Sequence, residues 1–127
     1  MSDVYDEVSA HHGLTRQQSR LLFVLHSSPS NMLGLGAELR LGKSTMTGVV
    51  ARMESAGLVE RSPDPRDRRN ALLTPTARGA KLALAFENEM RDRVLELLAP
   101  LDGDERDALG RLLSRVMERA EELLPSE

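Results

Sequence analysis

The sequence predicts a mainly α-helical (α+β) fold of about six helices and one small β-hairpin, in a single domain covering residues 1–127. Two observations predict it. Aromatic residues are only 2% of the chain although 40% is hydrophobic, so the core must consist of Leu, Val, Ala and Met, which favour packed helices over a β-sandwich. Several segments carry apolar residues at helical spacing, whereas residues 58–74 contain two short strand-like runs around a proline-containing turn.

The first two helices have recognisable ends. We expect a short helix over residues 3–11, which stops near Gly13. Thr15 is a suitable N-cap for a second helix that continues to about Ser27. The buried side of this second helix is expected to contain Leu21, Leu22, Val24 and Leu25.

A tight connection separates the next two helices. After a turn at residues 27–30, we expect a short helix that Asn31 caps and that ends at Leu39, although two glycines weaken its helicity by roughly 1 kcal/mol each. The following helix covers residues 43–56, and Gly57 ends it.

Two further helices follow the hairpin. Thr76 is the expected cap of a long helix that extends to about Ala99, where Pro100 stops it. Asp102 then caps a last helix that extends to about Leu124. The apolar stripe of this last helix must pack against its own domain or a second subunit, and it contains Leu109, Leu112, Leu113, Val116, Ala120, Leu123 and Leu124.

Composition excludes several classes of protein. The chain has no cysteine, which excludes disulfides, thiol redox sensing and cysteine-ligated zinc. The N-terminus has acidic residues and no apolar run, so we expect no signal peptide. No segment approaches the roughly 18–20 apolar residues that cross a bilayer. We therefore expect a soluble, cytoplasmic protein with no membrane partner.

The net charge of −3 is unevenly divided along the chain. Residues 40–69 hold seven basic residues against four acidic ones, a net charge of +3. Residues 1–39 carry −2 and residues 70–127 carry −4 by the same count. A basic middle between acidic ends would concentrate attraction for phosphate on one surface, although a mixed solvated surface could give the same contrast.

The helix at residues 43–56 has two different faces. Met46, Val49, Val50 and Met53 form the expected buried side, and the opposite side is nearly all small or hydroxylated. Small residues let a helix approach base edges in a DNA major groove, where hydroxyls and an arginine can contact bases or phosphates. The alternative is a surface helix that is poor in charge. The predicted DNA contacts on this helix and at the preceding helix start are Asn31, Lys43, Ser44, Thr45, Thr47, Gly48 and Arg52.

The expected hairpin, with strands near 58–61 and 71–74, concentrates charge in the segment SPDPRDRRN. Its two acids cannot pair all three arginines, so at least one guanidinium is free to enter a DNA minor groove. Strand alternation would place an acid beside the last arginine. The alternative is a solvated hairpin with exposed ion pairs of little energetic value. The predicted DNA contacts here are Arg66, Asp67, Arg68 and Arg69.

These residues resemble the multiple antibiotic resistance regulator (MarR) family of bacterial winged-helix transcription factors. The matching motifs are KSTMT, ESAGLVER and the wing residues Asp67, Arg69, Leu73, Thr76 and Gly79, and the likeness covers about residues 14–124. The resemblance implies a winged helix-turn-helix at residues 31–76 and helical dimerisation parts at residues 1–30 and 77–127. It further implies a homodimeric repressor that binds a pseudo-palindromic operator and is often released by a small phenolic or other anionic effector.

The chain departs from the family pattern at three points. Pro75 replaces the wing's second leucine, so we expect the second strand to end a residue early. Arg40-Leu41-Gly42 stands where the family more often has Gly-Leu-Asp, so the helix after it lacks an acidic N-cap. The segment before Leu14 is short, and dimerisation must then depend on the C-terminal helices.

Two other functions are open to a chain of this pattern. One is a winged-helix module that binds another protein and not DNA. The other is an enzyme, but no arrangement of nucleophile and base is suggested, and no cofactor is expected. His11 and His12 beside Asp6 and Glu7 could hold a metal, although a solvated, loosely ordered end is the simpler interpretation.

Overall fold

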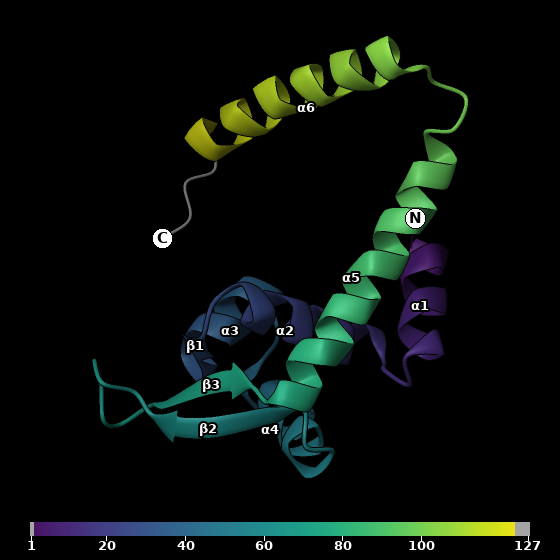
Figure 1. Cartoon of the computed structure of the whole chain (residues 1–127). Coiled ribbons are helices and arrows are strands. Elements are labelled where there is room, and N and C mark those ends of the chain that lie inside the picture. The colour runs from purple at the N-terminus through teal and green to yellow at the C-terminus, as the bar shows by residue number, and fades with distance from the viewer. Residues whose placement is uncertain (1, 124–127) are drawn as a thin grey trace. The chain divides into compact units, whose positions relative to one another are not determined.

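A computed structural model describes residues 2–123, and it contains the six helices and the hairpin that the sequence predicts (Figure 1). By contact density the chain divides into two units, Met1–Arg91 and Asp92–Glu127, which are described separately below. The elements in chain order are α1 (Ser2–His11), α2 (Arg16–Ser27), β1 (Ser30–Asn31), α3 (Met32–Leu39), α4 (Lys43–Ser55), β2 (Val59–Pro63), β3 (Ala71–Pro75), α5 (Ala77–Leu97) and α6 (Gly103–Leu123).

Side-chain caps begin four of the helices, as predicted. Thr15 and Gln18 form a capping box at α2, with Thr15 Oγ1 accepting from Gln18 N at 3.2 Å. Asn31 Oδ1 accepts from the amide of the third residue after it at 2.8 Å. Thr76 and Asp102 cap α5 and α6 in the same way, at 3.0 and 2.8 Å. Each such cap stabilises its helix by about 1 kcal/mol.

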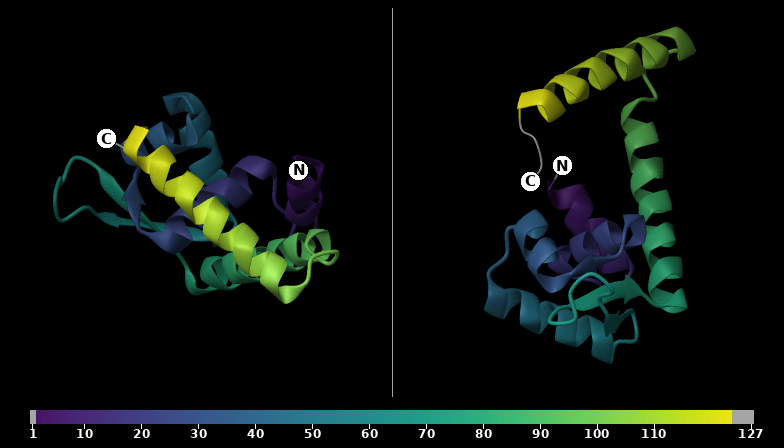
Figure 2. Two further views of the ribbon diagram at one scale, coloured as in Figure 1. Left: turned by 90° about the horizontal axis from the view of Figure 1, so that it is seen from above. Right: turned by 90° about the vertical axis from the view of Figure 1, so that its left-hand side faces the viewer.

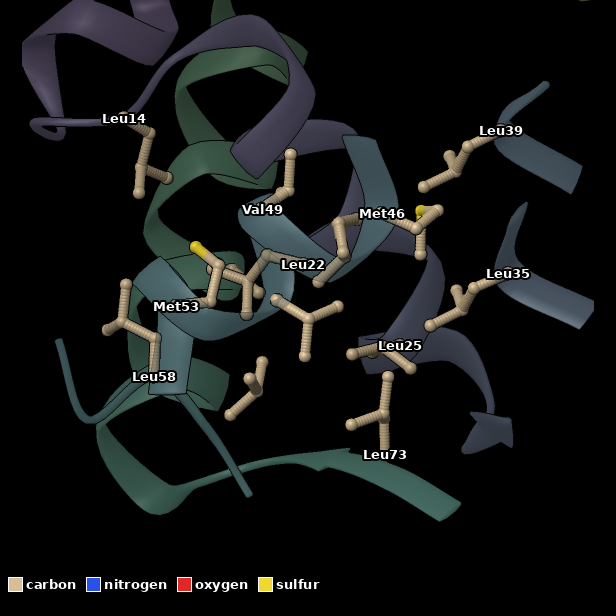
Figure 3. Packing of buried hydrophobic residues seen from close by; sticks show 14 residues of the cluster. Leu14, Leu22, Leu25, Leu35, Leu39, Met46, Val49, Met53, Leu58 and Leu73 are labelled. Carbon is tan, nitrogen blue, oxygen red and sulfur yellow. The ribbon is translucent and has the colours of Figure 1, made fainter. Parts of the chain in front are cut away.

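The main hydrophobic cluster of the first unit contains no aromatic side chain, as composition predicts, and the buried Phe86 of α5 lies outside it. Leu, Val, Met and Ala from α2, α3, α4, the sheet and α5 pack into one cluster (Figure 3). Leu21, Leu22 and Leu25 supply the buried side of α2, with Val24 partly buried against them. The predicted inner face of α4 is buried as well, and consists of Met46, Val49, Val50 and Met53.

The sheet differs from the prediction because it has three strands. Residues Ser30–Asn31, expected as the end of a turn and a cap, form the short strand β1, and the strand order is β1-β3-β2. Ser30 pairs with Leu73 and Asn31 with Leu72, both antiparallel. A strand is predicted from alternating apolar and polar residues, and two residues are too few to show that alternation. This strand forms because the connection between α2 and α3 lies beside β3.

The prediction that β3 ends before Pro75 is wrong. Leu58 O accepts from Thr76 N at 3.0 Å, and Asn70 O accepts from Asp64 N at 3.3 Å. Hydrogen-bonded and non-hydrogen-bonded pairs alternate in an antiparallel ladder, so the pair of Pro75 with Val59 is a non-hydrogen-bonded one. Pro75 therefore needs no N–H toward its neighbour and stays in the strand.

The end of α1 also differs from the prediction. His11 Nδ1 lies 2.9 Å from Glu89 Oε2, and His12 Nε2 lies 3.4 Å from Glu89 Oε1. The His12 ring also packs edge-on against Phe86 of α5. These two histidines are thus packed against α5 and not loosely ordered. Among residues 2–123, no group of three or more His, Asp or Glu side chains could hold a metal ion.

The second unit contains the end of α5 and all of α6. Helix α5 ends at Leu97, two residues before the predicted end, and a turn around Pro100 leads to α6. No residue between Gly103 and Leu123 is buried, and the predicted apolar stripe lies largely open: the exposed fractions of Leu112, Leu113, Val116 and Leu123 are 53–62%. Leu124, the last residue of that stripe, lies outside the described residues. Within the described part of the chain, none of the helices combines the length and apolarity that a membrane crossing requires.

Candidate nucleic-acid interface

Helix α4 presents the small, hydroxylated face that the sequence predicts. Lys43, Ser44, Thr45, Thr47 and Arg52 are exposed and Gly48 is partly exposed. The opposite face is at most 2% exposed, because it faces the core. The side chains that could contact a ligand and those that hold the helix in place are therefore fully separated.

The start of α4 has no side-chain cap. Gly42 is its N-cap residue, as expected from the sequence, and makes no side-chain hydrogen bond to the first turn. Thr47 Oγ1 donates to Lys43 O at 2.9 Å, which leaves the oxygen of this hydroxyl free to accept from another group. The exposed first turn thus offers amide donors and the Lys43 ammonium to an anion.

Arg52 lies back along its own helix. Its Nη2 atom is 3.6 Å from the position that a Cβ would take at Gly48, so the guanidinium lies in van der Waals range of the helix at that residue. Among the described residues, Arg52 has no hydrogen-bond or ion-pair partner. It is therefore free to change rotamer toward a bound surface.

Asn31 and Arg40 flank α3, the helix before α4. The side-chain oxygen of Asn31 is occupied as a helix cap, so its amide group is what remains for another partner. Arg40 is exposed and has a left-handed backbone (φ 56°), a conformation that favours glycine.

Two aspartates, Asp64 and Asp67, organise the backbone of the hairpin loop. The alternation of side chains that a strand would give, which was the expected arrangement, is not present in the loop. Asp64 is only 5% exposed and accepts from Arg66 N at 2.9 Å, so it does not belong to the exposed tip. Asp67 accepts from Arg69 N and from Asn70 Nδ2, both at 3.0 Å. The residues between β2 and β3 form turns, and both carboxylates stabilise that backbone.

The arginines of the loop remain available as a result. The Arg69 side chain is 95% exposed, and its Nε is 3.9 Å from Asp67 Oδ1. Arg66 and Arg68 are exposed and have no ion-pair partner among the described residues. The prediction that at least one guanidinium stays free is confirmed. Figure 1 and the left view of Figure 2 show that this loop projects beyond the helices of the first unit.

Comparisons with known proteins agree with this geometry. A family model described as "MarR family" matches residues 12–70. The transcriptional regulator HosA of Escherichia coli O111:H- is 38% identical over 76 residues, which are 59% of this chain and 56% of HosA. The chain therefore spans little more than half the length of that curated relative.

Solved structures extend the similarity over most of the fold. The apo form of MarR from E. coli superposes with a TM-score of 0.78 at 26% identity, covering 90% of this chain and 85% of that one. NadR in complex with 4-hydroxyphenylacetate superposes with a TM-score of 0.71 at 26% identity, covering 88% of this chain and 80% of NadR. Sequence, fold and exposed surfaces lead to the same conclusion: the chain is similar to the MarR family of transcriptional regulators in its winged-helix sequence and over most of its fold.

Proposed function

We propose that this protein is a sequence-specific, double-stranded-DNA-binding transcriptional regulator, and that it represses by binding a pseudo-palindromic operator as a homodimer. The observation that carries the proposal is the combination of two features: the small, hydroxylated face of α4, and a projecting loop with two unpaired arginines, Arg66 and Arg68, beside the almost fully exposed Arg69. A surface that only faced water would have no reason to keep acidic side chains off this face of α4 and to leave arginines of the loop unpaired.

Helix α4 would bind in the major groove. Ser44, Thr45 and Thr47 would contact base edges or phosphates through their hydroxyls, and Gly48 would let the backbone approach closely. Lys43 would bind a phosphate beside the uncapped first turn, and Asn31 would do so from the start of α3. Arg52 would contact a guanine or a phosphate.

The hairpin loop would act as the wing. Arg66, Arg68 and Arg69 would lie along the narrow, electronegative minor groove next to the site of α4. Asp67 would support this role indirectly, because its carboxylate accepts from the Arg69 amide and fixes the turn that carries the arginines. Together these residues assign DNA binding to residues 31–76.

The helical parts, residues 1–30 and 77–127, would form the dimer. The open apolar face of α6 supports this assignment, because such a face is stable in water only when another surface covers it. The proposed effector is a small anionic or phenolic molecule. It rests on the resemblance and on NadR, whose solved complex contains 4-hydroxyphenylacetate.

A salt titration of DNA binding tests the proposal. The protein would be added to labelled DNA from its own upstream region and to a scrambled duplex of equal length, and binding measured by fluorescence anisotropy from low to moderate salt. We expect preference for the upstream DNA and a linear fall of log K with log salt, because phosphate contacts release counterions. Protection of two half-sites about one helical turn apart, together with a dimeric mass, would support the homodimer.

The contrary result is absence of binding to both duplexes at low ionic strength. That outcome would favour the alternative of a winged-helix module that binds another protein. Binding to both duplexes with equal affinity would show a DNA-binding protein without sequence preference.

A further inference from the structure

The C-terminal end of α4 is attached to the first turn of α5 by three hydrogen bonds. Arg78 Nη1 donates to Ala56 O at 3.0 Å, and Thr76 Oγ1 donates to Gly57 O at 2.6 Å. Thr76 N donates to Leu58 O at 3.0 Å. Three consecutive carbonyls after α4 thus accept hydrogen bonds from residues that begin the next long helix. We call these contacts the α4–α5 joint.

Gly79 lets the two backbones of the joint approach closely. A Cβ at this position would overlap the carbonyl oxygen of Leu58 and crowd its carbonyl carbon, which is backbone and cannot turn away. Gly79 N also donates to Thr76 Oγ1, the same hydroxyl that donates to Gly57 O. The joint therefore packs backbone directly against backbone. The Thr76 hydroxyl takes part in it both as a donor and as an acceptor.

The two ends of α4 differ in how they are held. At its start, Gly42 provides no side-chain cap, and a Cβ there would meet nothing within 4 Å. Near its end, Glu54 Oε1 accepts from Arg61 Nε of β2 at 2.8 Å, in addition to the joint. Because polar contacts concentrate at the end, the joint adds to the core packing of α4 in fixing the direction in which its exposed face points.

We propose that the α4–α5 joint orients the recognition helix and that Arg78 is a positioning residue for sequence-specific DNA binding. The proposal rests on the DNA-binding function argued above. Arg78 acts through the Ala56 carbonyl: it fixes the last turn of α4, and α4 then presents its hydroxyls and Arg52 to base edges in one register. A displacement of the first turn of α5 also displaces the end of α4, since both share the joint.

Arg78→Ala, compared with Lys81→Ala, tests this role. Both substitutions remove one positive charge from an exposed position of α5, but Lys81 has no hydrogen-bond or ion-pair partner among the described residues. Affinity would be measured for the operator and for unrelated DNA at several salt concentrations. We expect Arg78→Ala to weaken operator binding about tenfold and to leave binding of unrelated DNA within about twofold, because base readout needs the orientation and phosphate attraction does not. Lys81→Ala should change neither affinity by more than about twofold.

Two further measurements separate positioning from other roles. Arg78→Lys retains a donor and a charge and should restore most of the operator preference. Hydrogen exchange at the amides of residues 56–58 in the DNA-free protein should be faster in Arg78→Ala than in Lys81→Ala. Thermal unfolding of both variants shows whether the fold is intact.

Three outcomes would overturn the inference. Equal losses on operator and unrelated DNA, with a shallower salt dependence, would make Arg78 a direct phosphate contact. Unchanged operator preference in Arg78→Ala would remove the joint from recognition. Unchanged hydrogen exchange at residues 56–58 would show that Arg78 does not restrain the end of α4. Failure of the unmodified protein to bind any DNA at low salt would instead refute the proposed function itself.

Discussion

Helices α4 and α6 carry apolar residues at the same spacing but differ in what covers them. The apolar side chains of α4 are at most 2% exposed, because α2 and α3 of the same chain pack against them. On α6 four apolar residues of the corresponding stripe are each more than half exposed, namely Leu112, Leu113, Val116 and Leu123. Periodicity thus identifies which face of a helix needs a partner, but not whether that partner is the same chain.

The polar faces of the two helices differ in their charge. The outer face of α4 is small and hydroxylated, with Arg52 as its one basic residue beyond the first turn. The outer face of α6 is charged and includes ion pairs such as Arg119 with Glu122 at 3.0 Å. A charged face is typical of a helix side that remains in water, whereas a bare face suits close contact with another macromolecule. The binding surfaces proposed for the two helices are therefore faces of opposite kinds: a small polar face on α4 and an apolar face on α6.

The largest expected effect is on stability. It appears when one methionine on each helix is truncated to alanine and the two losses are compared. Met53→Ala on α4 should lower the free energy of unfolding by about 2–5 kcal/mol, because it leaves a cavity in the core. Met117 on α6 is 59% exposed, and its truncation should matter only where α6 meets a second chain. Urea denaturation at two protein concentrations measures both. A concentration-independent loss of similar size for Met117→Ala would contradict the contrast.

A charge placed on the open stripe of α6 should dissociate the proposed dimer. Val116→Glu would place an unpaired carboxylate in each half of a symmetric interface, and we expect a cost of about 3 kcal/mol or more to dimerisation. The folded chain itself should be unaffected, because Val116 is exposed within it. Sedimentation equilibrium gives the mass, and Arg111→Ala on the same helix is the control. A Val116→Glu protein that stays dimeric would place the interface elsewhere.

The next effect is expected at Arg69, whose side chain is 95% exposed and which should contribute to operator binding. Arg69→Ala is expected to weaken operator binding by about 1–3 kcal/mol and to reduce the salt dependence, as for other good DNA contacts. Anisotropy titration beside Arg111→Ala, which removes one charge from α6, gives the comparison. If the two variants bind alike at moderate salt, the wing has no part in the mechanism.

The most selective effect is expected at Arg52, because its loss should depend on the DNA sequence. Arg52→Ala should cost about 1–3 kcal/mol on the operator but little on variants altered at the base pair that Arg52 reads, so preference among sequences relaxes. Competition between operator variants measures this. A uniform loss over every sequence would show that Arg52 contacts a phosphate.

Features with a local cause could be predicted from the sequence. Caps such as Thr15 and Asp102 depend on residues three positions apart, and the buried sides of α2 and α4 depend on spacing along one helix. The face of α4 and the surplus of arginine over acid in the loop were visible for the same reason. The assignment of DNA binding to residues 31–76 and to the named side chains remains a prediction.

Features with a long-range cause were mispredicted or missed. The strand at Ser30–Asn31 exists only because β3 lies beside it, and Pro75 stays in its strand because of the register with β2. The histidines at the end of α1 are ordered by Glu89, a residue about 78 positions later. None of these contacts leaves a signal in the neighbouring sequence.

The sequence by itself determined the helices, their caps, their apolar faces and the surplus of unpaired arginine, because each of these follows from side-chain chemistry within a few residues. Only the tertiary structure decided the third strand and the joint between α4 and α5. Those depend on backbone groups of distant segments that meet at hydrogen-bond distance, and backbone groups are the same in every residue type except proline.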